Sequence, residues 1–179
     1  MDKTAQKQIK ALSFLLQFPD AQTLESMRAQ SPLLEQAFEA PDRVHIRKFL
    51  QYLAQTPPLS VQEAFCAAFD LNPETCMNLT WHEYEDGAKR GVALARFARA
   101  FEAAGFDPAC SDLPDYLPMV LELLSLEENG AFQWVVFEHR HTIKVLEERL
   151  KSIQSPYAGI FQVLCGLFYA AANQCKKGA

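Results

Sequence analysis

Residues 111–125, SDLPDYLPMVLELLS, place two prolines and two aspartates before and within a leucine-rich run. If Asp115 caps a helix, Pro118 falls in the first turn, where its missing N–H loses no partner. At 100° per residue, one side of this helix collects the apolar residues Leu117, Val120, Leu121 and Leu124. Asp115, Met119 and Glu122 lie on the opposite side. We therefore expect the leucines to enter a core while the two carboxylates face outward.

Helical spacing of apolar residues recurs along almost the whole chain, and no convincing alternating pattern of a strand occurs. A chain of 179 residues with 49% apolar residues is long enough for one sizeable core. No repeat or flexible linker divides it. We therefore expect an all-α, single-domain helical bundle over residues 1–179, with a short polar tail from about residue 176.

Prolines and capping residues mark the helix boundaries that we expect. The first apolar stripe, Ile9 to Leu16, is ended by Phe18-Pro19, because the residue before a proline is pushed out of helical geometry. Pro57-Pro58 should end a helix, and Ser60 should cap the next with Glu63 in capping-box spacing. The predicted helices after the first lie within 22–40 (two short ones) and at about 41–55, 60–69, 87–105, 115–126, 133–152 and 156–174.

The bulk composition excludes several classes of protein. Lys and Arg number 17 and Asp and Glu 22, and the resulting net charge of −5 argues against binding a phosphate backbone. The apolar piece near the start is interrupted by Gln17 and Pro19 and makes a poor signal-peptide core. No run approaches the roughly 18 apolar residues of a membrane span, so we expect a cytoplasmic protein without membrane insertion. Five scattered cysteines fit reduced thiols better than a disulfide framework or a zinc module.

Acidic residues are segregated along the chain. Residues 49–88 hold six acids and residues 100–139 hold eight, and neither stretch contains a Lys or Arg. One interpretation is a negative field that attracts a cationic partner. The other is a face that only keeps the protein soluble, and the charge pattern alone leaves both open.

The stretch TWHEYED, residues 80–86, is the densest mixture of aromatic and acidic groups and lies in the least regular segment, residues 70–86. Around His82 stand Trp81, Glu83, Tyr84, Glu85 and Asp86. Recognition of a peptide suits this mixture, although a histidine that is only a structural tether fits as well. His139 and His141 are two residues apart and cannot share a metal ion from one helix face.

No HExxH, P-loop, GxSxG or GxGxxG motif occurs, so enzymatic classes have little specific support. We expect a binding protein with no catalytic residue, no metal and no cofactor of its own. The alternative from another class is a metal-dependent hydrolase that uses His82 with acids from residues 70–86.

Several stretches resemble one family, the cytoplasmic assembly chaperones of molybdenum enzymes, in particular the nitrate reductase delta-subunit branch of the TorD-like superfamily. The residues that carry the resemblance are Leu15 to Asp20, Phe65 to Asp70, His82 with Arg90-Gly91, Asp112 to Pro118 with Leu121-Glu122, Arg149-Leu150, and Ser155-Pro156-Tyr157 with Phe161 and Leu164. Tyr116 stands where histidine is common in the family's signature.

The resemblance implies an all-α fold and no enzymatic activity of its own. We expect a monomer or a weak dimer. The resemblance also implies binding to the basic N-terminal segment of a molybdoenzyme catalytic subunit until the molybdopterin cofactor is inserted. A basic segment would meet the acidic stretches found independently. The expected peptide-binding residues are Trp81, His82, Glu83, Tyr84, Glu85, Asp86, Asp115, Tyr116, Met119 and Glu122.

Overall fold

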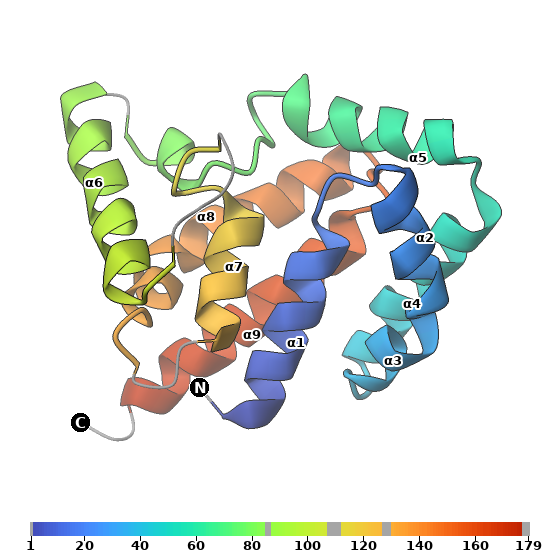
Figure 1. The fold of residues 1–179 in the computed structure, drawn as a ribbon, viewed down its shortest axis with the longest axis horizontal. Helices are drawn as coiled ribbons and strands as arrows, with labels where there is room; N and C mark the ends of the chain where they lie inside the picture. Colours follow the sequence, from blue (N-terminus) through green and yellow to red (C-terminus); the bar gives the residue numbers. More distant parts are fainter. Residues whose placement is uncertain (1, 85–86, 107–111, 127–129, 177–179) are drawn as a thin grey trace.

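The computed structural model describes residues 2–84, 87–106, 112–126 and 130–176, and these residues are helical apart from their connections (Figure 1). No strand occurs within the described ranges, and one isolated antiparallel bridge joins Asn78 to Tyr116. The predicted all-α class is thereby confirmed. Over the same ranges, no helix is long and apolar enough to cross a membrane.

The helices follow the periodicity of the sequence closely. In chain order they are α1 (Lys3–Leu15), α2 (Ala21–Ala29), α3 (Ser31–Gln36), α4 (Asp42–Gln55), α5 (Pro58–Phe65), the π-helical turn η1 (Cys66–Asp70), the 3₁₀ turn η2 (Leu79–His82), α6 (Gly87–Ala103), α7 (Leu117–Leu126), α8 (Trp134–Ser152) and α9 (Ala158–Lys176).

Side-chain caps fix the first two helix starts. The Asp2 Oδ1 accepts a hydrogen bond from the Ala5 N–H at 2.7 Å, and the Asp20 Oδ1 accepts one from the Thr23 N–H at 2.7 Å. Helix α5 begins at Pro58, so the expected start at Ser60 is wrong. A proline fits the first position of a helix, where its N–H has no partner to lose, and this lets α5 begin before the serine.

The core lies along the contacts of α1 with α7, α8 with α9, and α4 with α9. Leu117, Val120, Leu121 and Leu124 of α7 are all at most 1% exposed, which confirms the leucine face predicted for this helix. The Tyr157 ring, just before α9, lies 5.8 Å from the Phe65 ring and 5.0 Å from the Phe69 ring. Aromatic packing thus fixes the end of α5 and the π-helical turn on α9.

Helix α6 lies at one end of the molecule, and α2 to α5 lie at the other (Figure 1). Its buried Phe97 contacts the rings of Phe132, Trp134 and His139 at centroid distances of 6.2, 5.0 and 5.4 Å. The turn η2 also contacts α6 and α8. The segment that carries Trp81 and His82 is therefore held between two helices and the start of α7.

Candidate functional site

Asp115 is buried, and its expected position on an outward face is wrong. The side chain is 0% exposed, and its carboxylate accepts hydrogen bonds from Asn78 Nδ2 at 3.0 Å, the Thr80 N–H at 2.9 Å and Thr80 Oγ1 at 2.6 Å. Helix α7 begins two residues later, at Leu117. The helical projection failed here because Asp115 precedes the helix, and the chain before a helix does not follow its 100° rotation.

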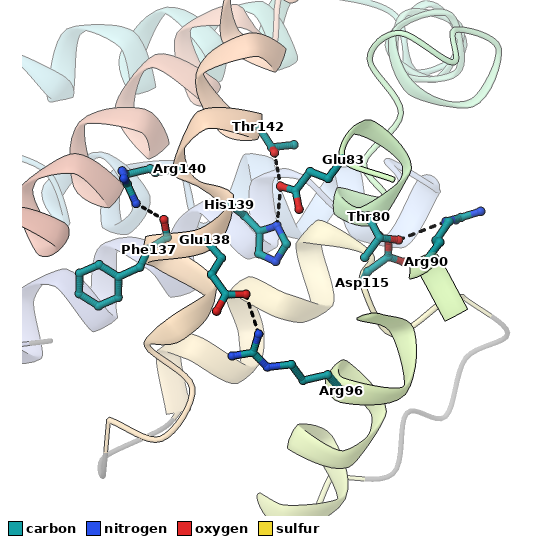
Figure 2. A network of polar contacts seen from close by, with 10 residues as sticks. All are labelled: Thr80, Glu83, Arg90, Arg96, Asp115, Phe137, Glu138, His139, Arg140 and Thr142. Carbon is teal, nitrogen blue, oxygen red and sulfur yellow. Dashed lines mark hydrogen bonds and ion pairs between the residues drawn. The ribbon is translucent and has the colours of Figure 1, made fainter. Parts of the chain in front are cut away.

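The Asp115 hydrogen bonds tie residues 77–80 to the start of α7. The Leu117 N–H donates to the Met77 carbonyl at 2.9 Å, and the Leu79 N–H donates to the Asp115 carbonyl at 3.2 Å. From α6, Arg90 Nε donates to Thr80 Oγ1 at 3.2 Å (Figure 2). Because both backbone and side-chain bonds converge on it, the turn is fixed although its sequence has no helical periodicity.

Trp81 is the large exposed side chain of this turn. It is 50% exposed, and its ring is held by a hydrogen bond from Nε1 to the Pro73 carbonyl at 3.1 Å. The Arg90 guanidinium carbon lies 5.3 Å from the ring centroid, within the range of a cation–π contact. A tryptophan that is both exposed and fixed in orientation is typical of a binding surface.

His82 points inward from the same turn. Its Nε2 lies 2.8 Å from the Cys76 carbonyl, which can only accept, so Nε2 carries the proton. Its Nδ1 lies 3.4 Å from Arg149 Nη1 of α8, which also donates to the Glu74 carbonyl at 2.8 Å. Burial lowers the pKa of His82, the hydrogen bond to Cys76 opposes this, and the Arg149 cation adds to the lowering. A neutral His82 therefore joins residues 74–82 to α8.

Glu83, the next residue, also contacts α8. Its Oε1 lies 2.7 Å from Nδ1 of His139, and Thr142 Oγ1 donates to the same oxygen (Figure 2). The Glu83 side chain is 21% exposed and that of His139 is 3% exposed. Glu83 is thus engaged within the protein and does not point its carboxylate at the solvent.

Tyr84 lines a pocket of about 310 Å³ between α6 and α8. Phe97 and Trp134 form aromatic walls, and His139 also lines it. Arg96 lies over the Trp134 ring at 3.6 Å and pairs with Glu138 at 2.6 Å. The pocket therefore combines flat apolar walls with charged groups and one imidazole.

Glu122 belongs to a different region, on the α1 side of α7. Met119 packs against the core, and Glu122 forms an ion pair with Lys10 and lies 3.4 Å from Ser13 Oγ. Tyr116 is half-buried at the bridge with Asn78. The ten predicted residues thus do not form one site. Trp81 to Tyr84 belong together with Asp115 and Tyr116, Met119 packs against the core, and Glu122 lies apart on the α1 side. Glu85 and Asp86 fall outside the described residues.

Acids that are segregated in the sequence are partly neutralised in space. Glu74 pairs with Arg149 at 2.9 Å, Glu83 with His139, Glu122 with Lys10, and Glu138 with Arg96. The cationic partners Arg149, Lys10 and Arg96 all lie outside the acidic stretches, whereas His139 lies at the end of the second stretch. The negative field is therefore weaker than the linear count of charges indicates.

Sequence reasoning missed His139, Arg96, Trp134 and Arg149 as parts of this region. His139 was considered only as a metal ligand beside His141, and no local pattern links it to Glu83, 56 residues earlier. Helical spacing places Trp134 and Glu138 about 40° apart on α8, but it places His139 about 140° from Trp134, so it gave no signal for His139. Within the described part of the chain, no group of three or more His, Cys, Asp and Glu side chains could hold a metal ion.

The fold and this region define an all-helical protein with a fixed turn that presents an exposed tryptophan beside an aromatic pocket. A family model described as nitrate reductase delta subunit matches residues 35–162, and the chain belongs to that family. This confirms the resemblance found in the sequence motifs.

Named relatives extend the match over almost the whole chain. The chain is 30% identical over 167 residues to the probable nitrate reductase molybdenum cofactor assembly chaperone NarJ of Bacillus subtilis (strain 168). The aligned residues cover 90% of this chain and 89% of that protein. It is 26% identical to the probable assembly chaperone NarW of Escherichia coli (strain K12), over 89% of this chain and 67% of that protein. It is 27% identical to the assembly chaperone NarJ of the same strain, over 92% and 71%.

Proposed function

We propose that this protein is a cytoplasmic chaperone for the assembly of a molybdenum enzyme of the nitrate reductase type. It binds the N-terminal segment of the enzyme's catalytic subunit and holds it until the molybdopterin cofactor is inserted. The relationship to assembly chaperones over about 90% of the chain carries this proposal. The client is thus a polypeptide, and the protein needs a surface that binds a polypeptide segment.

The turn η2 and its surroundings are the surface that we assign to the client. Trp81 offers apolar area that is held in place before binding, so little conformational entropy is lost on association. Two half-buried tyrosines lie beside the turn. Tyr84 follows it in the sequence, and Tyr116 forms the bridge with Asn78, just before the turn. Aromatic residues of this kind dominate the energetics of most protein interfaces.

Titration calorimetry with a synthetic N-terminal segment of the nitrate reductase catalytic subunit from the same organism tests this proposal. We expect the wild-type protein to bind it, and Trp81→Ala to bind it about 30-fold more weakly, as expected for an aromatic hot spot of about 2 kcal/mol. Leu59→Ala is the matched control, because Leu59 is also exposed, at 66%, but lies on α5. No binding by the wild-type protein would refute the proposed function, and unchanged binding by Trp81→Ala would remove this surface from it.

A further inference from the structure

The pocket between α6 and α8 has a volume and an aromatic lining that suit one aromatic ring. Its volume of about 310 Å³ is at the lower end of the roughly 300–1,000 Å³ that small-molecule sites occupy. Tyr84, Phe97 and Trp134 supply aromatic surface, and Arg96 lies over the Trp134 ring at 3.6 Å. Flat aromatic walls favour a flat, apolar occupant.

His139 brings an unsatisfied polar atom to this pocket. The residue is 2% exposed, and its Nε2 has no hydrogen-bond partner among the described residues. Figure 2 shows that Nδ1 faces Glu83, while the other ring nitrogen faces the side of the Arg96–Glu138 pair, which also lines the pocket. A buried polar atom without a partner carries a free-energy cost that a ligand can remove.

The partner of Nδ1 decides what kind of group Nε2 needs. The Glu83 carboxylate accepts, so Nδ1 carries the proton, and Nε2 of the neutral ring is left as an acceptor. Thr142 Oγ1 donates to the same Glu83 oxygen and holds the carboxylate in place. A matching occupant must therefore supply a hydrogen-bond donor at the His139 end of the pocket.

We infer that this pocket binds one aromatic side chain of the client polypeptide, whose hydroxyl or ring N–H donates to Nε2 of His139. A carboxylate has no donor for Nε2, and a cationic side chain would meet the net positive charge of a lining that holds Lys89 and Arg96 but only one acid, Glu138. A tyrosine or tryptophan side chain carries the donor without a charge.

The Arg96–Glu138 pair forms an exposed part of the pocket lining. These two side chains are 49% and 45% exposed, and exposed ion pairs contribute little to stability. If they move aside as the polar end of the ring approaches Nε2, the protein gives up this ion pair and the Arg96 contact with the Trp134 ring. Tyr84 lines the pocket and is also one of the residues that we assign to the client surface, so the pocket and that surface share this side chain. The identity of the occupant therefore rests on the proposed function, while the chemistry of the pocket does not.

Fragments of side chains test the chemistry of the pocket without any client. The chain has two tryptophans, so a Trp81→Phe background leaves Trp134, in the pocket wall, as the single fluorescent tryptophan. We expect 4-methylphenol, the tyrosine side chain, to change its emission saturably. We also expect 4-methylphenol to bind about 2- to 13-fold more tightly than toluene, the range for one net hydrogen bond. No saturable change would overturn the inference.

Three variants locate the fragment in the pocket and on Nε2. Ala93→Leu fills the pocket and should abolish binding, whereas Ala95→Leu makes the same change at an exposed position of α6 that does not line this pocket. His139→Asn keeps an N–H donor for Glu83 but removes Nε2, so the preference for 4-methylphenol over toluene should fall to about one. Binding by Ala93→Leu equal to that of Ala95→Leu, or an unchanged preference in His139→Asn, would refute the site.

The client arm uses the synthetic N-terminal segment described above with Trp81 intact. Ala93→Leu should weaken its binding by about tenfold relative to Ala95→Leu, and replacing the anchoring aromatic residue of the peptide by alanine should cost as much. Equal binding by Ala93→Leu and Ala95→Leu would refute the client side chain as occupant while leaving the proposed function standing. Failure of the wild-type protein to bind the segment would refute the proposed function, and with it the occupant, while the fragments still decide the chemistry of the pocket.

Discussion

At the scale of single residues, Asp115 stabilises the turn that bears Trp81. Its buried carboxylate accepts hydrogen bonds from Asn78 and from the backbone and hydroxyl of Thr80. Asp115→Asn replaces one acceptor oxygen by a donor and removes the charge, so we expect the free energy of unfolding to fall by about 1–3 kcal/mol. Urea denaturation measures this. The exposed Asp112→Asn is the control and should stay within about 0.5 kcal/mol, and an equal loss in both variants would contradict the role of Asp115.

His82 makes stability depend on pH. Burial lowers its pKa in the folded protein, so the unfolded chain takes up a proton first as the pH falls below about 6.5. The contribution of His82 is therefore complete above that pH and is lost as the pH falls toward the lower folded value. We expect the free energy of unfolding to fall between pH 7.5 and 5.5 by more in the wild-type protein than in His82→Gln. Identical slopes in the two proteins would show that His82 is not buried in its neutral form.

At the scale of elements, α7 separates a structural face from a surface face. Leu121 is a fully buried core residue on α7, so Leu121→Ala should lower the free energy of unfolding by about 2–5 kcal/mol. Glu122 makes a partly exposed ion pair with Lys10, at 37% and 51% exposure, so Glu122→Gln should cost no more than about 1 kcal/mol. Thermal unfolding of both variants measures the difference. If Glu122→Gln unfolds as early as Leu121→Ala, the ion pair matters more than the leucine face.

The same elements show how far the sequence predicts the structure. Apolar spacing predicted α7, α8 and α9 and the burial of Leu121, because periodicity is a local property that survives in any helical packing. The site was harder to predict, because its polar contacts join segments far apart in the chain. Asp115 meets Thr80 across 35 residues, and His139 meets Glu83 across 56. No spacing rule reports such pairs, and so Asp115 was expected in solvent and His139 was overlooked.

At the scale of the whole molecule, buried apolar residues from α1 to α9 pack into one cluster. We propose that the chain is a single domain and therefore expect one cooperative unfolding transition. Far-ultraviolet circular dichroism reports the helices, and tryptophan fluorescence reports Trp81 and Trp134 at the α6 end. The two transitions should have the same midpoint in urea. Earlier unfolding by fluorescence would instead make the α6 end a separate unit.

We propose that this protein binds its client at the turn that presents Trp81. Hydrogen exchange of the backbone amides, with and without the synthetic N-terminal segment, tests this claim most directly because it locates the contact without any substitution. We predict that exchange slows by about tenfold or more in residues 78–84 when the segment is bound, while residues 58–65 of α5 exchange as before. Bound peptide with unchanged exchange in residues 78–84, and slower exchange on another face, would contradict the claim.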